Sequence, residues 1–493
     1  MRLLVVVVGA ASLGVEIAAA RLLAPYFGAS TIVWANTIAT VLVALSAGYW
    51  LGGRLADRAP TLRALCRLVL CASLLLAGVP FVARPFLNVA VDALDSYSAG
   101  AFAGSLVAVV ALVGLPVALL GAVAPYAVRL SLGDVSASGS VTGGLYALST
   151  VGSLVGTFAS ALALVPFAGT QRTFLAFAAA LALVSAPALR PAALLAPIAI
   201  VVALVVAPVA GKPAPAGARV IEETETPYQY ARVVETADGT RQLELNEGVA
   251  IHSEYRPGSY LTDNYWDDFL VLPFAVRPQP PRRLAILGNA AGTTARAYGR
   301  FFPRTAVDAV EIDRRLTDIG RRLFDLHGPR LRLVTADARP FMRRSRAGRY
   351  DAIFVDAYRQ PYIPFYLATR EFFELVRSRL AAGGVVVVNV GHPEGDRRLE
   401  RAIAATMREA FPSVWRDPVR DVNTLLVGSA APIRVRALTA GTEGVPGELR
   451  QLAAAAGARL APALRGGEVY TDDRAPVEWL VDRSILRAAN RGH

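Results

Sequence analysis

A chain of 493 residues exceeds what one hydrophobic core usually holds, so two or three domains are expected. Apolar residues make up 54% of the sequence and the mean hydropathy is +0.42, with the excess before about residue 210. Of the basic residues behind the net charge of +12, only Lys212 is a lysine. The arginines are scattered rather than gathered with aromatic side chains, which argues against nucleic-acid binding. With two cysteines in one apolar stretch and four separated histidines, no metal site is expected.

Seven segments before residue 210 are each apolar over about the 20 residues needed to cross a bilayer. They are residues 3–23, 31–52, 64–83, 101–128, 141–165, 171–189 and 191–209. Most are rich in Gly, Ala and Ser, which permits close helix packing in lipid. The first segment could instead be a signal peptide, but Glu16 inside it and the six further segments favour a retained helix. We therefore expect a multi-pass α-helical bundle in the cell membrane.

A short Pro/Gly/Ala stretch, GKPAPAGA, follows and reads as a linker. After it, two alternating runs flank Asp238-Gly239, a dipeptide that strongly favours a β-hairpin. A small antiparallel β subdomain is therefore expected next. The predicted divisions are a transmembrane domain of about seven spans (1–210), a linker (211–219), a β subdomain with a connecting segment (220–280), a nucleotide-binding domain (281–430) and a mainly helical C-terminal region (431–493).

Four apolar runs in the nucleotide-binding domain each stop at a glycine or a carboxylate. In chain order, the runs end at Gly288, Glu311, Asp337 and Asp356. Buried parallel strands have this pattern when their carboxyl ends line a ligand crevice. Small residues from Gly288 to Gly292 let backbone approach a ligand, and the helix that follows offers unpaired N–H groups.

The second of these acids has the spacing of a ribose contact. Glu311 lies 23 residues after Gly288, close to the roughly 20-residue offset at which an acid accepts hydrogen bonds from ribose hydroxyls. The alternative for each acid is a helix N-cap in an ordinary α/β loop. Residues 385–390 are expected to form a fifth buried strand, and residues 423–428 a strand at the edge of the sheet.

The same runs resemble the polyamine aminopropyltransferases, the spermidine synthase family, which shares the class I methyltransferase fold. The resemblance covers roughly residues 220–480, and the N-terminal half resembles the membrane part of the fused, membrane-spanning branch. It implies a Rossmann-type α/β domain with a small N-terminal β subdomain. The stretches that carry it are PYQYARVV, NEGVAIHSEYRPG, GNAAGTTAR, VEID, ADAR, IFVDAY, YLATREFFELVRSRLAAGGVVVVNV and TDDRAPVE.

Family roles follow by position from this resemblance. Asp356 would be the proton acceptor, and Glu311 would hold ribose. Asp337 with Ala338 would contact adenine, and Gln229 would reach the nucleoside from the covering hairpin. Decarboxylated S-adenosylmethionine would be the co-substrate, with no metal.

The sequence also departs from the family pattern on the amine side. Ala291 stands where the family's glycine turn has an aspartate, Gln360 replaces a second acid after the fourth strand, and a Tyr-His-Glu motif becomes Tyr265-Trp266-Asp267. Two carboxylates that should bind a diamine are missing, each worth about 1.5 to 3 kcal/mol. Putrescine binding would suffer unless a nearby acid substitutes, the candidates being Asp263, Asp267 and Asp268.

The resemblance implies a transferase of polyamine biosynthesis: a membrane-bound aminopropyltransferase that moves the aminopropyl group to an amine such as putrescine. One alternative is a methyltransferase that uses S-adenosylmethionine. Another is a transporter or sensor whose C-terminal domain binds a nucleoside or polyamine without turnover. The expected partners are a small-molecule amine and the lipid bilayer, with a homodimer as a possible assembly and no nucleic acid.

Arginine placement predicts the orientation of the membrane half. The loop Gly52–Arg63 holds three arginines and is expected in the cytoplasm. Seven spans would then put the catalytic domain outside, whereas an adenosylated metabolite is made in the cytoplasm. Either the span count is off by one, near Arg190 or in the first segment, or the domain faces outward. We favour the first, with a cytoplasmic catalytic domain.

Overall fold

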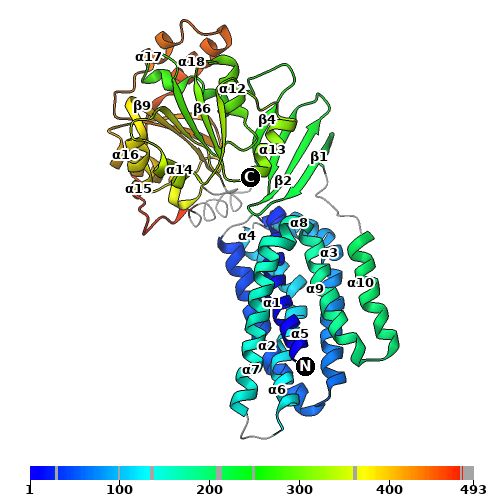
Figure 1. Ribbon diagram of the computed structural model, residues 1–493. Coiled ribbons are helices and arrows are strands. Elements are labelled where there is room, and N and C mark those ends of the chain that lie inside the picture. Colours follow the sequence, from blue (N-terminus) through cyan, green and yellow to red (C-terminus); the bar gives the residue numbers. More distant parts are fainter. Residues whose placement is uncertain are drawn as a thin grey trace. The chain divides into compact units, whose positions relative to one another are not determined.

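The computed structural model describes residues 1–27, 31–97, 100–133, 138–206, 214–246, 250–358, 363–477 and 480. The chain divides into two compact units (Figure 1). One comprises Met1–Lys212 with Thr224–Tyr230, and the other Pro213–Glu223 with Ala231–His493. The main division falls in the predicted linker 211–219, of which residues 211–213 lie outside the described part.

The first unit consists of helices. They are α1 (Arg2–Phe27), α2 (Thr31–Arg58), α3 (Leu62–Tyr97), α4 (Gly100–Val109), α5 (Leu115–Gly121), α6 (Val123–Ser131), α7 (Ser138–Ala159), α8 (Val165–Ala168), α9 (Thr170–Ser185) and α10 (Leu195–Val206). Two π-helical turns, Val110–Gly114 and Ser160–Leu164, join α4 to α5 and α7 to α8.

Length and composition single out six described helical stretches that could each cross a bilayer. They are Arg2–Ala24, Val33–Arg58, Leu62–Ala83, Gly104–Ser131, Ser138–Ala168 and Thr170–Ala188. The predicted seventh segment, 191–209, contains a shorter apolar helix, Pro191–Val206, and residues 207–209 lie outside the described part. The predicted count of seven, and the membrane itself, stay predictions.

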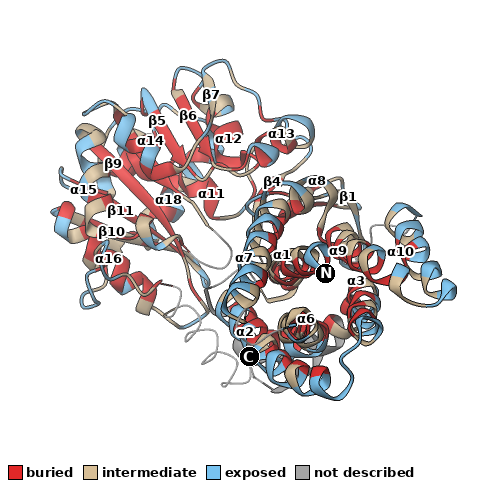
Figure 2. Ribbon diagram, turned by 60° about the horizontal axis from the view of Figure 1, so that its bottom comes forward, coloured by how far each residue is buried: buried red, intermediate tan, exposed pale blue. Residues whose placement is uncertain are grey.

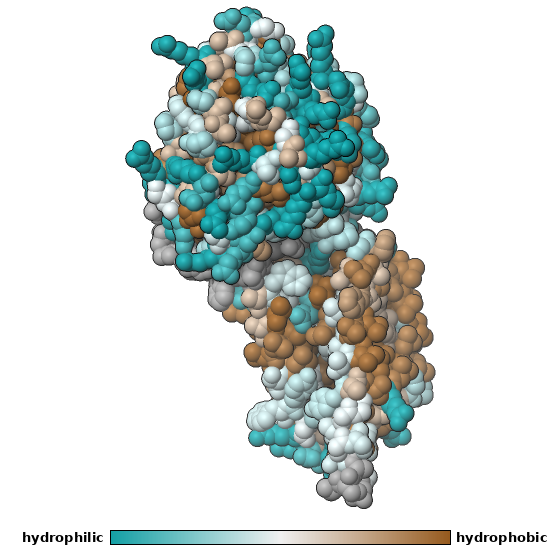
Figure 3. Space-filling model, turned by 60° about the vertical axis from the view of Figure 1, so that its left-hand side comes forward, coloured by the Kyte–Doolittle hydropathy of each residue, from teal (hydrophilic) through white to brown (hydrophobic). Residues whose placement is uncertain are grey.

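Glycines bring α1 and α7 into backbone contact. A Cβ added to Gly152 or Gly156 would collide with the carbonyl oxygen of Val6 or Ala10 on α1. The two glycines are four residues apart, so they lie on one face of α7 and let the two backbones approach. The outer surface of the unit is instead rich in exposed large apolar side chains (Figure 3), such as Leu154 on α7.

The second unit begins with the predicted β subdomain. Its four-stranded sheet has the order β1-β2-β3-β4, with strands β1 (Ala218–Glu225), β2 (Tyr230–Thr236), β3 (Arg241–Leu245) and β4 (Ile251–Tyr255). Strands β2 and β3 pair antiparallel across the turn that contains Asp238-Gly239. Gly239 has a φ of +81°, which favours glycine in this turn. The predicted hairpin is therefore present.

An eight-stranded sheet forms the centre of the unit, in the order β12-β10-β11-β9-β8-β5-β6-β7. The five strands from β9 to β7 are parallel and the other three pair antiparallel. The strands are β5 (Arg283–Leu287), β6 (Ala306–Glu311), β7 (Leu331–Thr335), β8 (Tyr350–Val355), β9 (Leu380–Gly391), β10 (Ser413–Arg420), β11 (Asn423–Ser429) and β12 (Ala461–Pro462). This mixed sheet confirms the predicted class I methyltransferase-like, Rossmann-type fold.

Helices cover both faces of this sheet (Figure 1). They are α11 (Tyr265–Asp268), α12 (Thr293–Phe301), α13 (Arg314–Leu323), α14 (Ala338–Arg344), α15 (Arg370–Arg379), α16 (Arg398–Ala410), α17 (Val435–Gly441) and α18 (Gly447–Arg459). Because side chains alternate along a strand, Ile353 and Val355 of β8 join the core with α14, α15 and α16, whereas Ala352 and Phe354 join the core with α12 and α18. The central strands are buried on both faces (Figure 2), as their continuous apolar sequences indicate.

One strand assignment was wrong. Residues 423–428 were expected at the sheet edge, but β11 lies between β9 and β10. The outer strand β10 contains Asp417 and Pro418, so its sequence hides the alternation by which strands are recognised. Beyond it, β12 adds a two-residue pairing within the region that was expected to be mainly helical, which does contain α17 and α18.

The turn after β5 lies very close to the end of β8. Gly288 has a φ of +86°, and an added Cβ would lie 2.5 Å from the Cα of Ala357 and closer still to the carbonyl oxygen of Asp356. We expect Gly288→Ala to destabilise the protein by about 2 kcal/mol or more. Gly299→Ala, in helix α12, is the matched control: its Cβ would come no closer than 3.4 Å to a neighbour, so stability should hold or rise slightly. Thermal melting of both purified proteins checks this, and equal melting temperatures would contradict it.

Candidate active site

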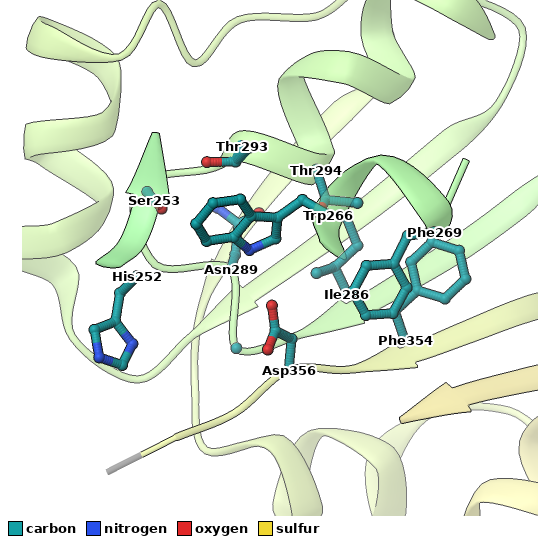
Figure 4. Close-up of a pocket in the computed structure, with 11 residues that line it drawn as sticks. His252, Ser253, Trp266, Phe269, Ile286, Asn289, Thr293, Thr294, Phe354 and Asp356 are labelled. Atoms are coloured by element: carbon teal, nitrogen blue, oxygen red, sulfur yellow. The ribbon is translucent and has the colours of Figure 1, made fainter. Parts of the chain in front are cut away.

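A hollow that opens to solvent lies at the carboxyl ends of β5 and β8 (Figure 4). The first turn of α12, the helix α11 and strand β4 close it on other sides. It is lined by His252, Ser253, Trp266, Phe269, Ile286, Gly288, Asn289, Thr293, Thr294, Phe354 and Asp356. The pocket therefore sits where parallel α/β sheets bind ligands, beside the predicted glycine turn.

Asp356 directly follows β8, and its carboxylate points toward the indole of Trp266 (Figure 4). Its Oδ1 accepts a hydrogen bond of 2.8 Å from the amide of Asn389, and its Oδ2 accepts one of 3.2 Å from the phenol of Tyr265. Among the described residues, no arginine or histidine forms an ion pair with it. The predicted proton acceptor thus lines the cavity without a neutralising cation.

Burial sets the protonation behaviour of this group. Loss of water raises the pKa of Asp356 to about 6, against hydrogen bonds from neighbouring side chains that lower it. The pKa of Tyr265 is raised well above its usual range, by burial first and by the negative charge of Asp356 next. Tyr265 therefore stays protonated as a donor at neutral pH. Asp356 is largely ionised at neutral pH, and its pKa is close enough to that pH for the group to exchange a proton.

A second amide fixes the orientation of the first. Asn423 donates its side-chain N–H to the Oδ1 of Asn389 at 3.0 Å, which leaves the amide nitrogen of Asn389 facing Asp356. The two asparagines come from the neighbouring strands β9 and β11. Sequence reasoning missed both of them, because Asn389 lies within the apolar run VVVVNV. The single polar residue of that run is the signal that could have located it.

In the glycine turn, Gly288 lines the pocket and Gly292 does not, and contact of either with a ligand stays a prediction. Gly292 has a φ of +99° and precedes α12 as its N-cap. Asn289 between the two glycines is 6% exposed, and both polar atoms of its side chain lack a hydrogen-bond partner. Because buried amides are nearly always paired, Asn289 in the pocket wall is suited to bind a polar ligand group. The sequence signal for it is an asparagine within the small residues of GNAAGT.

Glu311 ends β6, as predicted, but does not line the pocket. Its Oε2 accepts the N–H of Ala290 at 2.8 Å and its Oε1 accepts that of Asp313 at 3.0 Å. Burial raises the pKa of Glu311 to about 7, although these backbone donors lower it. The carboxylate thus braces the glycine turn, and each oxygen keeps a lone pair that a ribose hydroxyl can use.

The third acid adopts the alternative role of a helix cap. Asp337 is the N-cap of α14, where its Oδ1 accepts the N–H of Arg339 at 2.9 Å and its Oδ2 accepts the hydroxyl of Tyr366 at 2.8 Å. The backbone of the neighbouring Ala338 is buried in the first turn of that helix. Neither residue lines the pocket. An adenine contact for this pair stays a prediction.

Gln229 precedes β2 and is 6% exposed. Its backbone closes a turn with Thr226: Gln229 N–H donates to the Thr226 hydroxyl and the Gln229 carbonyl accepts from Thr226, at 3.0 and 2.9 Å. By contacts it belongs to the first unit, whereas the pocket lies in the second. Its nucleoside role therefore stays a prediction.

The three acids that were candidates to replace the missing carboxylates are bound elsewhere. Each has a partner outside the pocket: Asp263 pairs with Arg256 at 2.6 Å, Asp267 accepts the N–H groups of Thr262 and Asp263, and Asp268 pairs with Arg459 at 2.7 Å. Ala291 is fully buried in an apolar cluster with Leu316, Ile319 and Phe324. Among the described residues, Asp356 is the only carboxylate in the pocket wall.

Comparisons with known proteins identify a family of similar domains. Residues 270–426 match the family described as spermine/spermidine synthase domain. A protein of Bifidobacterium longum named "probable polyamine aminopropyl transferase" is 34% identical over 38% of this chain and 42% of its own length. Putrescine N-methyltransferase 1 of Nicotiana tabacum is 30% identical over 39% of this chain and 51% of its own. The chain thus spans about half, or less, of these curated relatives.

The solved structure of spermidine synthase from Thermotoga maritima matches with a TM-score of 0.37 at 16% identity, over 55% of this chain and 88% of that one. The residues matched by the family, 270–426, hold β5 to β9, the glycine turn and Asp356. The predicted resemblance to the spermidine synthase family is therefore confirmed over residues 270–426, which match a spermine/spermidine synthase domain.

Proposed function

We propose that this protein is a membrane-bound aminopropyltransferase that moves the aminopropyl group of decarboxylated S-adenosylmethionine to an amine. The observation that carries the proposal is Asp356: a buried carboxylate, free of any cation among the described residues, that opens on a pocket beside a glycine turn. An amine is mostly protonated at neutral pH, so the reaction needs a base at the attacking nitrogen. A carboxyl group with a pKa of about 6 suits that task.

The step balances without a metal or a redox partner. Asp356 takes one proton from the bound ammonium, which frees the nitrogen lone pair. That nitrogen attacks the aminopropyl carbon next to sulfur, so that a C–N bond forms and the C–S bond breaks. The electron pair of the broken bond neutralises the sulfonium, methylthioadenosine leaves, and the proton on Asp356 passes to water. Tyr265 and Asn389 hold the carboxylate in position throughout.

Donor binding is proposed for the opposite wall of the pocket. The unpartnered amide of Asn289 faces the space that the donor chain would occupy. Glu311 would hold the ribose, since its oxygens already lie at the glycine turn. Asp337 with Ala338 would contact the adenine, and Gln229 the nucleoside.

Methyl transfer from S-adenosylmethionine is the second candidate. Two observations favour it: Ala291 removes the acid that would meet the amino group of the donor's aminopropyl chain, and relatives named putrescine N-methyltransferase are 30% identical over 39% of this chain. The carboxylate of that donor would need N–H contacts near residues 289–294. The amide of Asn289 can supply one of them.

The catalytic domain is proposed to face the cytoplasm. With six spans and the arginine loop Gly52–Arg63 inside, the chain returns to the cytoplasmic side after the sixth span. The helix Pro191–Val206 is about 24 Å long at 1.5 Å per residue, shorter than the roughly 30 Å of a bilayer core. We propose that it does not cross, which places the span-count error near Arg190.

The products distinguish the two reactions. The purified full-length protein, offered each adenosyl donor with a set of amines, should release methylthioadenosine from the decarboxylated donor. S-Adenosylhomocysteine as the only nucleoside product would instead establish methyl transfer. No product from any combination would favour a binding or sensing role.

Asp356→Asn should lower kcat/KM by about 10²- to 10⁴-fold, the usual contribution of a general base. The wild-type pH profile should rise with pH up to about 6 and then level off, because Asp356 must lose its proton to act. This limb should be absent from the residual activity of Asp356→Asn. The matched control is Asp351→Asn: Asp351 begins the same strand, accepts the N–H groups of Arg282 and Arg283, and should be dispensable for rate. A near-normal rate for Asp356→Asn would exclude the proposed role.

Asp356→Asn should be more stable than the wild type at high pH. The folded pKa of Asp356 is raised to about 6, so its neutral form stabilises the fold below pH 4, and this stabilisation is lost as pH rises through 6. At pH 8 the buried charge costs on the order of 2 kcal/mol, which asparagine avoids. Thermal melting should therefore favour Asp356→Asn more at pH 8 than at pH 5. A difference of opposite sign would show that the charge is stabilised in the fold.

Reporter fusions test the membrane arrangement in a bacterial host. Green fluorescent protein fused after His493 should fluoresce, and alkaline phosphatase at the same point should be inactive, because both report a cytoplasmic terminus. Fusions after Tyr97, which follows the third span, should give the reverse pattern. Active phosphatase at His493 would show that the helix Pro191–Val206 crosses the membrane.

A further inference from the structure

The pocket offers one negative charge to the amine that it binds. Its other described polar residues are uncharged or basic: His252, Ser253, Asn289, Thr293 and Thr294. The hydroxyl of Thr293 is occupied by the backbone of Glu254, donating to its carbonyl at 3.2 Å and accepting its N–H at 2.8 Å. The acids in the neighbouring turn are all paired with other groups. Among the residues that the structure describes, Asp356 is thus the single available counter-charge.

Apart from the indole N–H of Trp266, whose hydrogen bond lowers the pKa of Asp356, the rest of the wall beside Asp356 is apolar. Trp266, Phe269, Ile286 and Phe354 line it, each at most 3% exposed. The rings of Phe269 and Phe354 pack with centroids 4.7 Å apart, and the indole of Trp266 faces the carboxylate (Figure 4). A hydrocarbon or aromatic group can be buried against this wall at no electrostatic cost, whereas an ammonium would lose its hydration there with only the aromatic faces as partial compensation.

A diamine at neutral pH carries two ammonium groups, and only one can pair with Asp356. The second would be desolvated against aromatic and aliphatic side chains without a carboxylate. The loss of one charged hydrogen bond lowers affinity about tenfold or more. An acceptor whose distal end is apolar avoids that loss and gains contact with the wall.

We propose that the acceptor is a primary monoamine, with a single ammonium on an apolar aliphatic or aromatic body, rather than a diamine such as putrescine. This inference rests on the proposed transfer reaction. The ammonium lies at Asp356, where it loses one proton, and the apolar body extends along Trp266 and Phe269. Bond making and breaking are unchanged: the C–N bond forms, the C–S bond breaks, and the product is a secondary amine.

The test compares acceptors of matched length on the full-length protein with decarboxylated S-adenosylmethionine. Pentylamine and phenethylamine should show kcat/KM values at least about tenfold above those of putrescine and cadaverine, measured by release of methylthioadenosine. Equal or better use of either diamine overturns the inference and leaves the transfer reaction intact. No methylthioadenosine with any amine overturns both, so the two failures are distinguishable.

A designed second charge sharpens the test. Thr294 lines the pocket on the first turn of α12, and an acid is favourable at a helix N-terminus. Thr294→Asp should raise the ratio of diamine to monoamine kcat/KM about tenfold, because it supplies the missing counter-charge. Thr294→Asn, of the same shape without the charge, should keep the wild-type ranking. A ratio that rises equally in both variants, or in neither, contradicts the inference.

Discussion

The cost of keeping a carboxylate out of water governs this site. Asp356 is held at the end of a strand that is buried on both faces, and its backbone N–H is bonded to Leu287 on the neighbouring strand at 2.8 Å. The fold offsets part of the desolvation with hydrogen bonds from Tyr265 and Asn389 and supplies no cation. An arginine in their place would lower the pKa and remove the ability to accept a proton near neutrality. The incomplete compensation is therefore what keeps the pKa of Asp356 raised, at about 6.

The same strand neighbours fix the distance between Asp356 and the glycine turn. Because β5 and β8 are adjacent, the turn at Gly288 touches the backbone that follows Asp356, with no room for a side chain between them. Glu311 braces that turn from the other side by accepting the N–H of Ala290. The spacing of Asp356 and the glycine turn thus depends on three consecutive strands of the sheet, with the Glu311 side chain as a brace.

The sequence predicted the parts of the site that follow one another along a strand. Runs that end in an acid located Glu311, Asp337 and Asp356, since apolar periodicity and strand ends are local properties. The sequence could not show whether an acid has an ion-pair partner elsewhere in the chain. Asp268 lies in the motif that was read as a substitute, but its partner Arg459 is 191 residues away. The inward-facing amide of Asn389 was equally hidden, because it depends on which strand lies beside β8.

The paired asparagines determine which oxygen of the Asp356 carboxylate can take up a proton. Asn423 occupies the carbonyl of the Asn389 amide, so Asn389 can only donate to the Oδ1 of Asp356. A carboxylate oxygen that accepts an N–H hydrogen bond is disfavoured as the site of protonation. We therefore expect a proton taken up by Asp356 to reside on Oδ2. The phenol of Tyr265, 3.2 Å from Oδ2, then has to rotate and turn its lone pair toward the new O–H. The orientation of one rotating hydroxyl thereby follows the protonation state of Asp356.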